Sequence, residues 1–143
     1  MSVTLLKLFS ANERSFNMNM QGITHEESLK QINNSNCINW IAGHIVFYRN
    51  SVLGLLGLPP IAGEQYKPIY ERGSKMTNTT KAEKVETLSM IFNAAQPGIM
   101  EGISKITDEQ VLGKIAFAGF HEAYHIGQLG IVRKLIGKEG AIK

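Results

Sequence analysis

Residues 115–137 read IAFAGFHEAYHIGQLGIVRKLIG, and this stretch decides the class of fold. Its apolar side chains recur every three or four residues, which predicts a helix from about Ile115 to Ile136 that stops at Gly137. The face expected to point into the core carries Phe117, Phe120, Tyr124, Gly127, Ile131 and Leu135. A neighbouring stripe, expected to border a cleft between helices, carries His121, His125, Gln128 and Val132.

Three segments upstream have the same helical spacing of apolar residues. They run from about Ser2 to Met20, from about Asn36 to Leu56, and from near Thr79 or Thr80 towards Ser104. Gly57 followed by Pro59-Pro60 is a helix stop signal, and Pro97-Gly98 is expected to kink or split the third segment. Residues 24–27 fit a capping box, which predicts a short helical turn there.

The segment from residue 58 to residue 78 has no clear periodicity and contains Tyr66 and Tyr70. A link of this length is uncommon in a small domain, so we expect either a lid over a site or a long crossover between the second and third helices. Four helices joined by polar links predict an all-α, four-helix bundle, and the 143 residues fit one domain spanning 1–143.

Composition narrows the possible partners and location. Hydrophobic residues make up 43% and charged residues 19%, which is typical of a folded globular chain. The net charge of +3 is modest and its lysines and arginines are scattered, so no nucleic-acid partner is expected. No apolar run reaches the ~18 residues that span a bilayer, so no membrane association is expected. Cys37 is the sole cysteine, which favours a reducing, cytoplasmic setting.

The main chemical signal is the histidine pair of the last predicted helix. His121 and His125 are four residues apart, so both imidazoles project from one face about one turn apart, and such a pair can hold one metal ion. A pair without a metal role, with one ring exposed and the other hydrogen-bonded in the core, is the alternative.

His44 is the candidate third ligand. It lies in the middle of an apolar helix between Trp40 and Phe47, where a buried imidazole needs a hydrogen-bond partner or a metal. A core histidine with a satisfied hydrogen bond is the alternative. Three histidines would leave an open position for water or substrate, as in catalytic sites; zinc fits such ligands best, and nickel or iron also suits them. His25 is expected at the surface.

Other polar residues near these histidines have less specific signals. Gln128 and Tyr48 are candidates for the pocket wall or for partners of the ligands. Glu122 could accept a proton, but one position from a ligand is about 100° round a helix, so a solvated surface charge is the expected role. Arg49 could attract an anion, although a surface arginine paired with solvent is the usual case. Cys37 is expected to pack in the core and not to bind metal.

Two motifs together resemble the DinB/YfiT-like superfamily. They are Asn39-Trp40-Ile41-x-Gly43-His44 and His121-Glu122-x-Tyr124-His125-x-Gly127-Gln128. The resemblance covers essentially the whole chain and includes the long crossover. It implies a four-helix bundle of up-down-down-up topology, one divalent metal on His44, His121 and His125, and a homodimer.

Relatives in that superfamily include thiol-dependent S-transferases, a thiol-dependent maleylpyruvate isomerase and proteins regarded as metal-dependent hydrolases. The resemblance therefore implies an enzyme that transfers a low-molecular-weight thiol cosubstrate to an electrophilic small molecule. The alternatives are a metal-dependent hydrolase of a small substrate and a non-enzymatic metal-binding or interaction bundle. The sequence assigns no catalytic residue beyond the metal ligands.

Overall fold

The computed structural model describes residues 2–77 and 80–142, and within these ranges the chain is helical with no strand. The all-α prediction is therefore confirmed for the described residues. The elements are α1 (Ser2–Met20), α2 (His25–Ser28), α3 (Ile38–Leu55), η1 (Glu64–Tyr66), α4 (Lys67–Tyr70), α5 (Val85–Lys105) and α6 (Glu109–Leu135).

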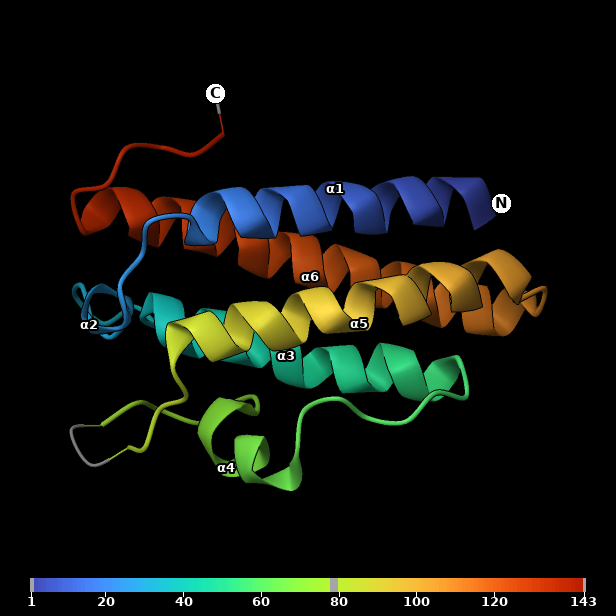
Figure 1. The fold of residues 1–143 in the computed structure, drawn as a ribbon, viewed down its shortest axis with the longest axis horizontal. Helices are drawn as coiled ribbons and strands as arrows, with labels where there is room; N and C mark the ends of the chain where they lie inside the picture. The colour runs from blue at the N-terminus through green and yellow to red at the C-terminus, as the bar shows by residue number, and fades with distance from the viewer. Residues whose placement is uncertain (1, 78–79, 143) are drawn as a thin grey trace.

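The long helices α1, α3, α5 and α6 lie side by side around a common core (Figure 1). α1 packs against α5 and α6, and α3 packs against the same two helices, so α1 and α3 are diagonal to each other. In Figure 1, α1 and α6 run from right to left, whereas α3 and α5 run from left to right. This arrangement puts α3 and α6, the two helices that carry the candidate ligands, in direct contact.

Several predicted boundaries agree with local physics. Thr24 caps α2 in a capping box with Glu27, as residues 24–27 predicted. The chain leaves α3 through Gly57 at a φ of 71°, a conformation that glycine adopts without steric cost. Of the predicted kink or split at Pro97, the split does not occur, because Pro97 lies within a continuous α5.

Two predicted helix starts are wrong. α6 begins at Glu109 and not near Ile115, because the Asp108 side chain accepts hydrogen bonds from the backbone N–H groups of Gln110 and Val111. α5 begins at Val85 and not near Thr79 or Thr80; Thr79 itself lies outside the described residues.

Long-range hydrogen bonds hold the segment before α5 out of a helix. The Asn39 side chain donates to the carbonyl of Glu83 (2.8 Å), and the backbone N–H of Glu83 donates to the Tyr70 hydroxyl (2.9 Å). The same hydroxyl donates to Asn39 Oδ1 (2.9 Å). The backbone groups of Glu83 are therefore bound to tertiary partners and do not extend α5.

The predicted core face of the last helix is wrong. Its large side chains are exposed: Phe117 70%, Phe120 63%, Tyr124 58%, Ile131 62% and Leu135 51%. The buried face instead carries Leu112, Ile115, Gly119, Glu122, His125, Ile126, Leu129 and Val132. Gly119 belongs to this face because a Cβ there would lie 2.7 Å from Leu8 Cδ2, so α1 approaches α6 closely at that point.

The link between α3 and α5 packs against the bundle through its tyrosines. Tyr66 and Tyr70 are 4% and 0% exposed and belong to the hydrophobic core, so both side chains hold the link against the bundle. The Tyr70 ring occupies the space beside Gly43, where a Cβ would overlap the Cε1 atom of that ring. A glycine in α3 thus lets the link lie directly on the helix that carries His44.

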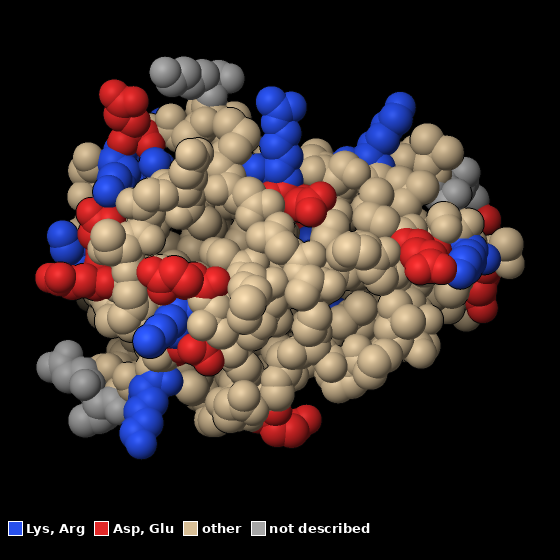
Figure 2. Space-filling view, viewed as in Figure 1, with Lys and Arg blue, Asp and Glu red and all other residues tan. Residues whose placement is uncertain are grey.

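The surface of the described residues has no concentrated charge on the face drawn in Figure 2, where Lys and Arg side chains are interspersed with Asp and Glu. Among the described helices, none combines the length and the apolar character needed to cross a bilayer.

Candidate metal centre

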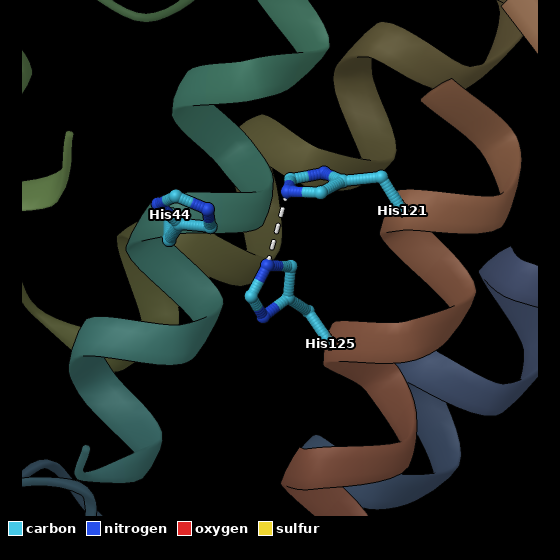
Figure 3. A group of neighbouring side chains, drawn as sticks. All are labelled: His44, His121 and His125. Atoms are coloured by element: carbon cyan, nitrogen blue, oxygen red, sulfur yellow. Dashed lines mark hydrogen bonds between the residues drawn. The ribbon is translucent and has the colours of Figure 1, made fainter. Parts of the chain in front are cut away.

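His44 from α3 and His121 and His125 from α6 converge on one space between the two helices (Figure 3). One ring nitrogen from each lies within 4.8 Å of the other two. The Nε2 atoms of His121 and His125 are 3.1 Å apart. Two ligands of one tetrahedral zinc, each ~2.0–2.1 Å from the ion, lie about 3.3 Å apart, so this pair needs little movement to bind one ion.

Hydrogen bonds fix the tautomers of two rings. His44 Nδ1 is 2.7 Å from the Tyr70 carbonyl oxygen, which can only accept, so Nδ1 carries the proton and Nε2 keeps its lone pair. His125 Nδ1 is 2.7 Å from Gln128 Oε1, which leaves the Nε2 lone pair of that ring facing His121. Metal-binding histidines usually donate their second N–H to a carbonyl in this way.

Burial keeps the three rings neutral. It lowers the pKa of His44 from 6.5 to about 4, outweighing the hydrogen bond to Tyr70, which raises this pKa. Burial also lowers the pKa of His121, helped by the neighbouring His125, and it lowers the pKa of His125 against the opposing effect of Gln128. Neutral imidazole is the form that binds metal, so the set can bind metal at pH 7 without losing protons first.

The chemistry of the donor set fits a divalent ion. The Nε2 atoms of His121 and His125 face each other. Because Nδ1 of the neutral His125 ring carries the proton, its Nε2 can only accept a hydrogen bond. Without an ion, the contact is therefore favourable only when His121 Nε2 carries a proton. An ion bound between the two atoms would use both lone pairs. Within the described residues, no cysteine or carboxylate joins the three histidines, so at least one position of a four-coordinate ion would stay open.

Aromatic rings form the surroundings of His44. The Trp40 ring stacks on His44 with centroids 4.7 Å apart, and Tyr48 lies 4.5 Å from His44 and 5.1 Å from His121. Of the two predicted auxiliary residues, Gln128 therefore contacts a candidate ligand by a hydrogen bond, and Tyr48 contacts two candidate ligands through its ring.

A cavity of about 380 Å³ adjoins the histidines between α3 and α6. His121 and Tyr48 belong to its wall, so the cavity borders the candidate metal centre at His121. Another cavity of about 380 Å³, bordered by α1, α6 and residues 140–142, has no histidine in its wall. The first cavity is thus the one placed to hold a substrate beside a metal.

The expected surface roles of Glu122 and Arg49 are both wrong. Arg49 is 1% exposed and Glu122 5% exposed, and they form a two-pronged ion pair: Nε to Oε2 at 2.8 Å and Nη2 to Oε1 at 3.0 Å. Arg49 Nη1 also donates to the Phe92 carbonyl (2.8 Å), and its guanidinium lies 3.4 Å from the centre of the Phe92 ring. Arg49 is the one formally charged residue in the sequence of α3, which is a signal that could have indicated a buried partner.

Two other expectations have different outcomes. Cys37 is buried in the core, as predicted, and burial raises the pKa of its thiol. His25, expected at the surface, is half-buried in α2, and it is not part of the histidine group.

A comparison of the chain with models of known protein families gave no match, and a comparison with curated proteins gave none either.

Proposed function

We propose that this protein is a DinB-like metalloenzyme that transfers a low-molecular-weight thiol to an electrophilic small molecule. The observation that carries the proposal is the convergence of three neutral imidazoles on one point beside a cavity. A divalent ion at that point would lower the pKa of a thiol and so favour the nucleophilic thiolate. Zinc is the ion that this ligand set favours, with nickel or iron as alternatives.

The protein's own side chains would position the reactants. The Tyr70 carbonyl and Gln128 orient two of the imidazoles, so the ligands are held before an ion arrives. The Tyr48 ring contacts His44 and His121 and belongs to the cavity wall, where it would contact the substrate and exclude water.

Hydrolysis is the second candidate activity, and the ion pair counts against it. Activation of a water needs a nearby proton acceptor. Glu122 is the carboxylate next to a ligand in sequence, but both of its oxygens bind Arg49. Thiol transfer does not need a nearby proton acceptor, since a thiol is already a few per cent ionised at pH 7.

A non-enzymatic bundle with a structural ion is the third candidate. Structural zinc sites normally have four protein ligands. The described residues supply three, beside a cavity, which favours a reactive site over a structural one.

Two features support the proposed DinB-like arrangement. Helices α1 and α6 run in one direction, and α3 and α5 run in the opposite direction. The link between α3 and α5 runs along the outside of the bundle. These features correspond to the up-down-down-up order and long crossover that the sequence motifs imply.

We also propose that the protein forms a homodimer through the exposed face of α6, which consists of Phe117, Phe120, Tyr124, Ile131 and Leu135. These positions, with Gly127 among them, are spaced by three and four residues, the pattern of a helix that packs on another helix. Between Lys114 and Arg133 the one charged residue is Glu122, which is buried, so the centre of this face is uncharged.

The area of the α6 face fits a second copy of the chain. Three aromatic side chains exposed by 58% or more would bury roughly 300–450 Å² when covered. That is about half of the ~800 Å² per partner of a standard interface, before the aliphatic side chains are added. Sedimentation velocity should show a dimer for the wild type and a monomer for Phe120→Asp, with Met90→Asp, on exposed α5 surface, as the control. A monomeric wild type would refute the dimer.

Metal content and thiol turnover test the enzymatic proposal. Plasma mass spectrometry of tag-free protein should find about one divalent ion per chain, lost in a His121→Ala, His125→Ala double variant and kept in His25→Ala. The loaded protein should consume a thiol when an electrophile is added, and the double variant should not. Metal binding with hydrolysis in the absence of thiol would support the second candidate, and metal binding without any turnover the third. Absence of metal, even after incubation with zinc or nickel, would refute both enzymatic candidates and the structural ion, and would leave a metal-free interaction bundle.

A further inference from the structure

The cavity beside the histidines has an apolar wall with an excess of positive charge. Its apolar part comes from Ile45, Val52, Leu55, Phe117 and Ala118. Four charged residues also border it: Arg49, Glu122, Arg72 and Lys114. Arg49 and Glu122 neutralise each other in their buried ion pair. Arg72 and Lys114 are exposed and make no ion pair within the described residues, so the wall keeps a formal charge of +2.

The link holds Arg72 in its place at the cavity. The Trp40 indole N–H donates to Ser74 Oγ (2.9 Å), and the Ser74 hydroxyl donates to the Glu71 carbonyl (2.7 Å). These bonds tie the residues around Arg72 to α3. Lys114 comes from the first turns of α6, so the two cations reach the cavity from different elements.

We infer that this cavity binds a small carboxylate-bearing substrate, with its apolar body against Val52 and Leu55 and its carboxylate groups on Arg72 and Lys114. A volume of about 380 Å³ is at the small end of the ~300–1,000 Å³ of ligand pockets, which suits a metabolite-sized molecule. Cations at the mouth of a cleft with low-dielectric walls raise the local concentration of anions. A carboxylate accepts two hydrogen bonds from a guanidinium in one plane, which adds orientation to the attraction.

This inference deepens the proposed function and rests on it, because it names a chemical class for the molecule that reacts beside the metal. The carboxylate could belong to the thiol cosubstrate or to the electrophile. In either case the anionic groups would bind at the outer part of the cavity and direct the reacting atom towards His121, which lies in its wall.

Calorimetric titration with phenylsuccinate tests the inference. This dicarboxylate has an apolar ring and no thiol, and 2-phenylbutane-1,4-diol is its uncharged counterpart. The full chain, incubated with zinc, should bind the dicarboxylate at least ten times more tightly than the diol. Binding should weaken several-fold between low salt and about 0.3 M salt, because the cations are exposed. An Arg72→Gln, Lys114→Gln double variant should lose at least tenfold in affinity for the dicarboxylate and little for the diol.

The control is a Lys67→Gln, Lys84→Gln double variant, which removes two exposed lysines that do not border the cavity and should bind as the wild type does. Equal affinity for dicarboxylate and diol, no measurable binding of either, or equal losses in both double variants would overturn the inference. Dicarboxylate binding that depends on zinc but not on Arg72 and Lys114 would also overturn it. The titration measures carboxylate binding whether or not the chain retains zinc, so failure of the carboxylate site and failure of the metal proposal are distinguishable. Mercaptosuccinate and thioglycerol, titrated in the same way, would show whether a thiol adds to the carboxylate contribution.

Discussion

The buried ion pair between Arg49 and Glu122 supports a prediction that can be worked out in magnitude. Glu122→Leu would leave a guanidinium that is 1% exposed with the Phe92 carbonyl as its remaining hydrogen-bond partner. Removal of one partner of a buried pair costs about 3–5 kcal/mol, because the other charge stays buried without compensation. Arg49→Met should destabilise the protein by the same amount, because it leaves the buried Glu122 carboxylate unpaired.

The double variant Arg49→Met, Glu122→Leu should be far more stable than the sum of these losses suggests. Two apolar side chains of similar volume replace two charges, and such exchanges are often neutral or stabilising. The free energy of unfolding should therefore lie within about 2 kcal/mol of the wild type, whereas additive losses would amount to roughly 6–10 kcal/mol. A total stability of ~5–15 kcal/mol leaves little margin for either single variant, so Glu122→Gln serves as a milder substitute.

Urea unfolding followed by circular dichroism measures this coupling. The same cycle on Lys105 and Glu101, an exposed pair on α5, should be nearly additive because solvent screens it. Loss of less than about 1 kcal/mol in Glu122→Leu, or additivity in the Arg49–Glu122 cycle, would refute the reasoning that the pair is buried and mutually dependent.

Three further predictions concern the histidines and the link. First, the metal-free protein should lose stability as the pH falls from about 6.5 towards 4. The pKa of His44 is about 4 in the folded state and higher in the unfolded state, so the unfolded state binds more protons over this range. The free energy of unfolding should fall by up to roughly 3 kcal/mol, which urea unfolding at stepped pH measures. A flat profile would contradict the burial of this ring. Second, Gly43→Ala should destabilise the protein by about 1–3 kcal/mol and expose the link to proteolysis, because the added Cβ would collide with Tyr70. The control is Gly54→Ala in the same helix, whose Cβ meets nothing within 4 Å and which should be neutral or slightly stabilising. Equal behaviour of the two variants would argue against the packing of the link on α3. Third, Gln128→Leu should reduce zinc affinity by about 10–100-fold in a competition titration, because the imidazole that it orients loses its acceptor. Unchanged affinity would show that this hydrogen bond does not orient the ring.

The sequence predicted the helical class, the extents of α1 and α3 to within two residues, and the three histidines that the structure brings together. Helical periodicity and stop residues act within a few turns of the chain, so they can be recognised without tertiary information. His44 could be singled out because a polar ring in an apolar helix requires a partner wherever the helix packs.

The face that α6 buries was decided by tertiary structure alone. Two stripes on this helix have the same three-and-four spacing, and the one richer in aromatic residues was expected to be buried. The structure buries neither stripe as a whole but a face that includes Gly119 and Glu122, because Gly119 allows α1 to approach and Glu122 pairs with Arg49 of α3. Neither reason is local: each depends on which residue of a distant helix lies opposite.

The start of α5 and the cationic cavity depend on the fold in the same way. The backbone of Glu83, just before α5, is held by Asn39 and Tyr70, which lie 44 and 13 residues from it in sequence. Arg72 and Lys114 are ordinary surface cations in the sequence, and they share a cavity because the link packs on α3, which itself lies against α6. Local periodicity thus determined the helices and the candidate ligands, whereas contacts between distant residues determined which faces are buried, which charges are paired and what the site can bind.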